Sequence, residues 1–144
     1  MLEEELLKLL LCLVVGSLIG WERKHREKPV GMRTMSLVCI GACLATIITA
    51  KYAAHDTGRI LAGIVTGIGF LGAGAIISRG SNVHGLTTAT SIWAIAIIGM
   101  IIGLGDYLLA IAASLIMFLL LQVDIIGRKI VKHSDMSNAK KRKI

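Results

Sequence analysis

Charged residues are absent from five long stretches of this 144-residue chain. These apolar runs extend from Leu9 to Trp21, Met35 to Ala50, Ile60 to Ser78, Leu86 to Gly105 and Tyr107 to Val123. A soluble domain spreads its charges over every helix, so their crowding into short segments excludes an ordinary soluble fold. Most of the runs have the length of a bilayer-spanning helix, which is about 20 residues.

Cysteine is scarce, and all three cysteines, Cys12, Cys39 and Cys43, fall inside apolar runs. This placement excludes the disulfide framework of a small secreted protein and favours packing roles. The first run also lacks the basic start of a signal peptide, because it follows the acidic triplet Glu3 to Glu5. We therefore interpret it as a retained membrane span.

Catalytic motifs are missing as well. The chain has no H-E-x-x-H, no G-x-S-x-G and no paired carboxylates within an apolar run. Its four histidines lack the i, i+4 pairing of a helical zinc site. We therefore expect a protein that is not an enzyme and that needs no cofactor.

The apolar runs predict an all-α integral membrane protein with a bundle of five transmembrane helices in one domain, residues 1–126. The expected spans are about residues 6–21, 35–50, 60–78, 86–104 and 107–124, and residues 127–144 form a basic tail. Basic residues next to spans orient a chain and meet anionic lipid headgroups, so the positive charge indicates the bilayer as partner and not a nucleic acid.

Orientation follows from the distribution of Lys and Arg. With five spans, thirteen of the sixteen basic residues lie on one side, and Lys8, Lys51 and Arg59 lie on the other. The positive-inside rule then places the N-terminus outside and the C-terminus in the cytoplasm.

The third run contains Gly67, Gly69 and Gly72 in the spacing G-x-G-x-x-G, which is typical of dinucleotide-binding loops. Such a loop needs an acidic residue about 20 positions later, and none occurs between Asp56 and Asp106. The segment is instead predicted to be a glycine-rich membrane helix.

On that helix Gly63, Gly67 and Gly74 share one side, whereas Gly69 and Gly72 face elsewhere. We expect these glycines to be helix-packing surfaces and the third span to be the centre of the bundle. A broken or substrate-lining helix is the alternative.

The fourth run begins with hydroxyl residues, among them Thr87 and Thr88. Helix capping and hydrogen bonds to neighbouring carbonyls explain them most simply. The alternative is a polar pocket in which Arg33 or Arg79 holds an anionic group near the helix N-terminus. On the outer side, Asp56 and Asp106 are candidate ligands for Mg²⁺, which prefers hard oxygen ligands.

Several ordered motifs resemble the membrane domain of the MgtC/SapB family, in the manner of its short SapB-type members. They are "GSLIGWERKHREKPVGMRT" from Gly16, "DTGRI" from Asp56, and "GIGFLGAGAI" followed by "VHGLTTATSIW" ending at Trp93. The residues matched by motif are Glu22, Arg23, Pro29, Gly31, Arg33, Asp56, Arg59, Gly67, Gly69, Gly72, Gly74, Gly85, Thr87 and Thr88.

The resemblance implies a multi-pass protein of the prokaryotic cytoplasmic membrane that is linked to magnesium homeostasis and to life at low magnesium. It favours a modulator of membrane partners or of ion balance. A direct transporter or channel for Mg²⁺ or another small solute, working as an oligomer, is the alternative. A homodimer is the expected assembly.

Two departures from the family pattern stand out. MgtC-type members continue into a soluble domain after the fifth span, whereas this sequence has a short basic tail after Gly127. Ala62 and Gly63 stand where the pattern after "DTGRI" predicts a glutamine. Roles assigned to that domain or that amide are therefore not expected here.

The orientation makes a direct prediction. A reporter that is active only in the periplasm, fused after Ile144, should be silent, and the same reporter on the N-terminus should be active. An active C-terminal fusion would contradict the arrangement of five spans.

Overall fold

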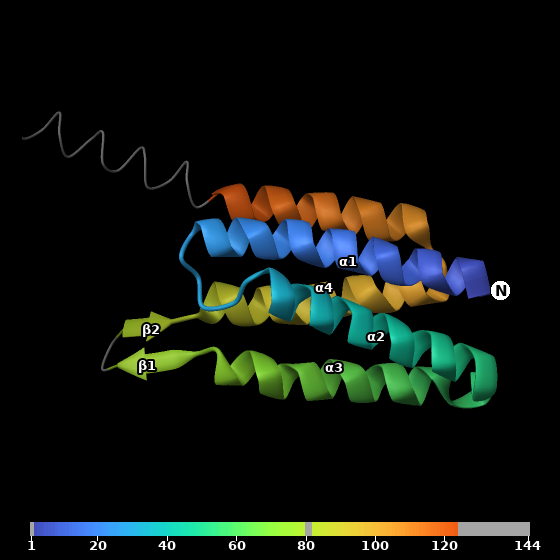
Figure 1. The fold of residues 1–144 in the computed structure, drawn as a ribbon. Helices are drawn as coiled ribbons and strands as arrows, with labels where there is room; N and C mark the ends of the chain where they lie inside the picture. The colour runs from blue at the N-terminus through green and yellow to red at the C-terminus, as the bar shows by residue number, and fades with distance from the viewer. Residues whose placement is uncertain (1, 80–81, 124–144) are drawn as a thin grey trace, which may run out of the picture. The chain divides into compact units, whose positions relative to one another are not determined.

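The computed structural model describes residues 2–79 and 82–123. Its labelled elements are α1 (Leu2–His25), α2 (Met32–Tyr52), the 3-10 helix η1 (Ala54–Asp56), α3 (Thr57–Gly74), β1 (Ile77–Arg79), β2 (Asn82–His84) and α4 (Leu86–Leu104) (Figure 1). A further apolar helix, without a label, covers Tyr107–Val123. The architecture is all-α apart from the short hairpin formed by β1 and β2. The predicted tail, residues 127–144, lies outside the described residues.

The chain divides into two compact units, Met1–Ser114 and Leu115–Ile144, and each is considered by itself. All of the packing below belongs to the first unit. There α2 packs against both α1 and α4, and α3 packs mainly against α4 (Figure 1).

Among residues 2–79 and 82–123, three helices are long and apolar enough to cross a membrane: Met32–Tyr52, Ala54–Gly74, in which η1 continues into α3, and Leu86–Leu104. The helix Tyr107–Val123 is apolar but shorter. Helix α1 is not among the three, and it carries Lys8 near its start and Glu22 and Arg23 near its end. A helical membrane protein is thus confirmed by length and composition, whereas five spans and their orientation stay predictions.

The third helix ends at Gly74, four residues before the predicted boundary at Ser78, because the chain turns into a hairpin there. Strands β1 and β2 are antiparallel and pair Ile77 with His84. Gly85 then starts α4 with a φ of 86°. A Cβ at this position would lie 1.9 Å from the carbonyl oxygen of Ala75, so the return from α3 to α4 requires glycine both for its φ and for its size.

Helix α1 ends in a Schellman motif. The amide of Lys28 donates to the carbonyl of Arg23, and the amide of Glu27 donates to that of Lys24. Glu27 occupies the left-handed position that usually holds glycine, with a φ of 54°. Pro29 follows and prevents the helix from continuing.

The backbones of α1 and α2 touch where two glycines of α1 face the start of α2. A Cβ on Gly16 would lie 2.5 Å from Cα of Ser36, and one on Gly20 would lie 2.4 Å from Cα of Met32. Real Cβ atoms do not approach so closely, so any larger residue would separate the helices. Gly16 and Gly20 are four residues apart and therefore lie on one face of α1.

The contact of α2 with α4 also depends on two glycines. A Cβ on Gly99 would lie 2.2 Å from the carbonyl oxygen of Cys39, and one on Gly103 would lie 2.7 Å from Cβ of Thr46. Cys39 and Thr46 are completely buried. Helix α2 is therefore held between α1 and α4 at backbone contact, and it forms the centre of the unit.

The expectation of a central third helix is wrong. Only Gly72 of α3 is buried, and it contacts Ala89 of α4. A Cβ on any of the other four predicted packing glycines, Gly63, Gly67, Gly69 and Gly74, would meet nothing within 4 Å. The physical reason is that α2, packed between α1 and α4, occupies the centre of the unit. Helix α3 is continuous from Thr57 to Gly74, so the described structure has no break in it.

Glycines at helix contacts and glycines in open space should respond differently to replacement by alanine. Gly99→Ala should destabilise the fold by about 1–3 kcal/mol, because the new methyl group forces α4 away from α2. Gly69→Ala, in open space on α3, should be neutral or stabilising by up to about 1 kcal/mol. Denaturation in detergent micelles measures both values, and equal stabilities would contradict the close contact of α2 with α4.

Candidate functional site: a buried ion cluster at the end of helix α1

Two oppositely charged residues are buried where α1 meets the start of α2. Glu22 is 3% exposed and Arg23 is 2% exposed. The guanidinium groups of Arg23 and Arg26 each donate an Nε–H to a different carboxylate oxygen of Glu22. The sequence singled out Glu22 and Arg23, and the structure brings them together and adds Arg26.

The cluster lies within one turn of a close glycine contact. Gly20 lets α1 approach Met32 at the first turn of α2. The last turn of α1 is basic, with Arg23, Lys24 and His25, and cations there interact favourably with the helix dipole.

The cluster holds one carboxylate between two guanidinium groups. Both oxygens of Glu22 already accept hydrogen bonds, so they are engaged by arginine instead of facing a metal ion. Ionised groups are costly to bury, and in membrane proteins they are retained mainly where they have a function.

The hydroxyl groups at the start of α4 mostly bond to their own helix. Ser91 donates to the carbonyl of Thr87 at 2.7 Å, and Thr90 donates to the same carbonyl at 3.0 Å. Thr87 is exposed and Thr88 is buried. Bonding to neighbouring carbonyls is thus confirmed, whereas side-chain capping is not, since the N-cap residue is Gly85.

Arg33, the cation proposed for a polar pocket near these hydroxyl groups, is exposed in the first turn of α2. That turn contains no acidic residue. The pocket itself stays a prediction.

The two candidate metal ligands have separate local partners. Asp56 forms an ion pair with Arg59 at 3.1 Å, and Asp106 accepts a hydrogen bond from the amide of Leu109 at 3.1 Å. Asp106 therefore caps the helix that starts at Tyr107. Within residues 2–79 and 82–123, no group of three or more His, Cys, Asp or Glu side chains is placed to hold a metal ion.

Ion pairs also join the beginning of α1 to its surroundings. Lys51 donates to Glu5 at 2.8 Å, and this hydrogen bond holds the pKa of the Glu5 carboxyl below its usual range. Lys8 pairs with Glu4 at 3.0 Å. The pair of Lys51 with Glu5 ties the start of α1 to the end of α2, whereas the pair of Lys8 with Glu4 lies within α1.

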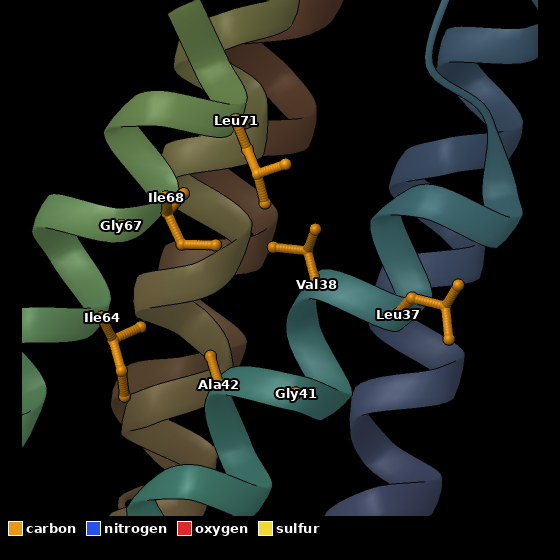
Figure 2. A pocket seen from close by; sticks show the side chains of 8 residues that line it. All are labelled: Leu37, Val38, Gly41, Ala42, Ile64, Gly67, Ile68 and Leu71. Atoms are coloured by element: carbon orange, nitrogen blue, oxygen red, sulfur yellow. The ribbon is translucent and has the colours of Figure 1, made fainter. Parts of the chain in front are cut away.

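An apolar groove of about 420 Å³ runs between α2 and α3. In Figure 2 the side chains of Val38, Ile68 and Leu71 point into the space between these helices. Its full lining is Leu37, Val38, Gly41, Ala42, Ile64, Gly67, Ile68 and Leu71. Such a lining suits hydrocarbon or an apolar helix and offers no ligand to an ion.

The predictions from sequence did not include the four glycines that bring α1 and α4 into backbone contact with α2. The signal was available, because Gly16 and Gly20 form one G-x-x-x-G motif and Gly99 and Gly103 form another. This spacing is typical of close helix contacts in membranes.

The glycine contacts, the apolar helices and the buried charges define a helical membrane protein. Comparison with known proteins then specifies the family, since the model of the MgtC family matches residues 9–126. The chain belongs to the MgtC family. No solved structure matches it.

Relatives agree with this assignment. Protein MgtC of Salmonella typhimurium strain LT2 is 45% identical over 111 residues, which cover 77% of this chain and 48% of the relative. "Putative magnesium transporter YhiD" of Escherichia coli K12 is 40% identical over 132 residues, which cover 85% of this chain and 61% of the relative. The chain thus spans about half the length of the MgtC proteins it matches.

The buried cluster makes a stability prediction. Glu22→Ala should cost about 3–5 kcal/mol, because it leaves the guanidinium of Arg23 buried without its partner. Replacing both residues, Glu22→Leu with Arg23→Met, should restore most of the loss. Glu4→Ala is the control, because that exposed ion pair is worth at most about 1 kcal/mol. Denaturation in detergent tests this, and a single variant as stable as the double variant would contradict the account.

Proposed function

We propose that this chain is a protein of the cytoplasmic membrane and acts in magnesium homeostasis by modulating other membrane proteins. The observation that carries the proposal is the backbone contact of α2 with α1 on one side and with α4 on the other. A path between these three helices would require their backbones to separate. The exposed apolar surface of α3 supports the proposal, since it is available for contacts in the plane of the membrane.

The link to magnesium rests on the family and on the name of the relative YhiD. In this role the chain performs no catalysis. The orientation proposed with it, from the distribution of Lys and Arg, has the N-terminus outside and the C-terminus in the cytoplasm.

The alternative is direct transport of Mg²⁺ or another small solute by an oligomer. The name of the relative YhiD, which describes a magnesium transporter, favours transport. A conduit would then have to run between copies of the chain, because α2 closes the space between α1 and α4 in a single copy.

Two measurements on the same protein separate these functions. We expect proteoliposomes to show no Mg²⁺ flux above empty vesicles under a gradient and a membrane potential. Cells should nevertheless depend on the chain for growth at low magnesium, and affinity capture at low magnesium should return a stoichiometric membrane partner.

Flux that falls in Arg33→Gln, Asp56→Asn or Thr87→Ala variants would overturn the modulator and support transport. Gly69→Ala provides the matched control, because a Cβ at this position on α3 would meet nothing within 4 Å. Normal growth at low magnesium without the chain would contradict both functions.

A further inference from the structure

Helix α1 has an apolar side that is largely exposed. Leu10, Val14, Leu18 and Trp21 are 58%, 53%, 56% and 55% exposed. At about 100° per residue these four side chains fall within about 80° of one another, and we call them the apolar stripe of α1. The two glycines of α1 that contact α2 lie about 140° away around the helix axis. The stripe therefore faces away from α2.

One end of the stripe lies level with the start of a helix that is long enough to cross a membrane. Gly20 contacts Met32, the first residue of α2, and α2 is one of the candidate spans. Because α1 and α2 are antiparallel, the stripe runs beside the apolar part of α2. From Trp21 to Leu10 it extends about 16 Å, which is about half the thickness of the hydrocarbon core.

Cations follow the stripe directly. The segment 24–33 contains four of them and one carboxylate: Lys24, Arg26, Lys28 and Arg33, and Glu27. Arg26 is engaged by Glu22. Among the residues that the structure describes, no ion pair involves Lys24, Lys28 or Arg33. The segment thus carries positive charge that the described chain does not neutralise.

Two of these cations are held beside the stripe. Lys24 is exposed on the last turn of α1, about 60° around the helix axis from Trp21. The amide of Lys28 donates to the carbonyl of Arg23 at 3.1 Å, which keeps Lys28 next to that turn. The ring of Trp21 stacks on the ring of His25, with 5.7 Å between the centroids and 23° between the planes. An indole thus stands between apolar stripe and cations, at the level that tryptophan favours in membranes.

We propose that this side of α1 binds an anionic phospholipid. One acyl chain lies along the apolar stripe, the indole of Trp21 lies near the glycerol, and Lys24 and Lys28 contact the phosphate. Charge selects this occupant, because an apolar helix would leave both ammonium groups unmatched. A soluble anion or an acidic soluble partner would leave the stripe uncovered, and phosphatidylcholine carries a cation of its own beside the phosphate. This inference does not depend on the proposed function.

Quenching of Trp21 by lipids with brominated acyl chains tests the proposal in reconstituted vesicles. Trp93→Phe leaves Trp21 as the one tryptophan of the chain. The vesicles are made of phosphatidylcholine with a rising fraction of brominated phosphatidylglycerol or, for comparison, brominated phosphatidylcholine. A lysine near an anionic headgroup contributes about fivefold to binding. Half of the quenching should therefore occur at a fraction of brominated phosphatidylglycerol about tenfold lower than that of brominated phosphatidylcholine.

Paired substitutions separate the site from overall charge. Lys24→Gln with Lys28→Gln should remove most of the preference for phosphatidylglycerol, and Lys24→Arg with Lys28→Arg should retain it. The matched control is Lys51→Gln with Arg59→Gln, which removes two cations at the end of α2 and the start of α3 and should leave the preference unchanged. None of the four lysines and arginines is buried, so these variants should fold, and thermal denaturation in detergent verifies this.

A second reporter on the same protein tests the location. Trp21→Phe leaves Trp93, which is 44% exposed on α4, a helix that contains no charged residue. Quenching of Trp93 should differ little between the two brominated lipids.

Four results would overturn the proposal. Equal quenching of Trp21 by the two lipids would show that this side of α1 does not select an anion. The same preference at Trp93 would show a general attraction of the protein for anionic lipid. Loss of the preference in millimolar inorganic phosphate would indicate a site for a soluble anion, and loss on dilution of the protein in lipid would place another copy on this side of α1.

Discussion

Backbone contact between helices is the constraint on which the rest of the structure depends. Inside a bilayer, helices gain little from hydrophobic burial against one another, so they associate through close packing. In this chain α2 meets α1 at Gly16 and Gly20 and meets α4 at Gly99 and Gly103. The other features follow from this arrangement: α2 becomes the centre, α3 is left at the periphery, and the end of α1 is drawn against the start of α2.

The last of these consequences connects packing to charge. Glu22 and Arg23 lie within one turn of Gly20 and are buried. Burial makes the pairing of Glu22 with Arg23 and Arg26 obligatory, because an unpaired charge in that position is costly. A family motif that the sequence presents as a basic loop thereby contains a buried ion cluster at the end of α1.

Glycines of identical spacing have two different environments in this chain. Those of α1 and α4 are in contact with backbone, whereas Gly63, Gly67 and Gly74 of α3 face open space. The close contacts therefore fix the interior of the first unit, whereas α3 presents glycine surface that no described residue covers.

The sequence alone determined the helical membrane class and the family, because apolar runs, hydroxyl clusters and ordered motifs are local properties of the chain. The predicted bounds 35–50, 86–104 and 107–124 also lie within three residues of both ends of α2, of α4 and of the helix Tyr107–Val123. Only the tertiary structure decided that α2 and not α3 is central, that Arg26 joins Glu22 and Arg23, and that α3 ends at Gly74 before a hairpin. The physical reason is that spacing shows which residues share a face of a helix, whereas the neighbour of that face is chosen by the packing of the whole unit.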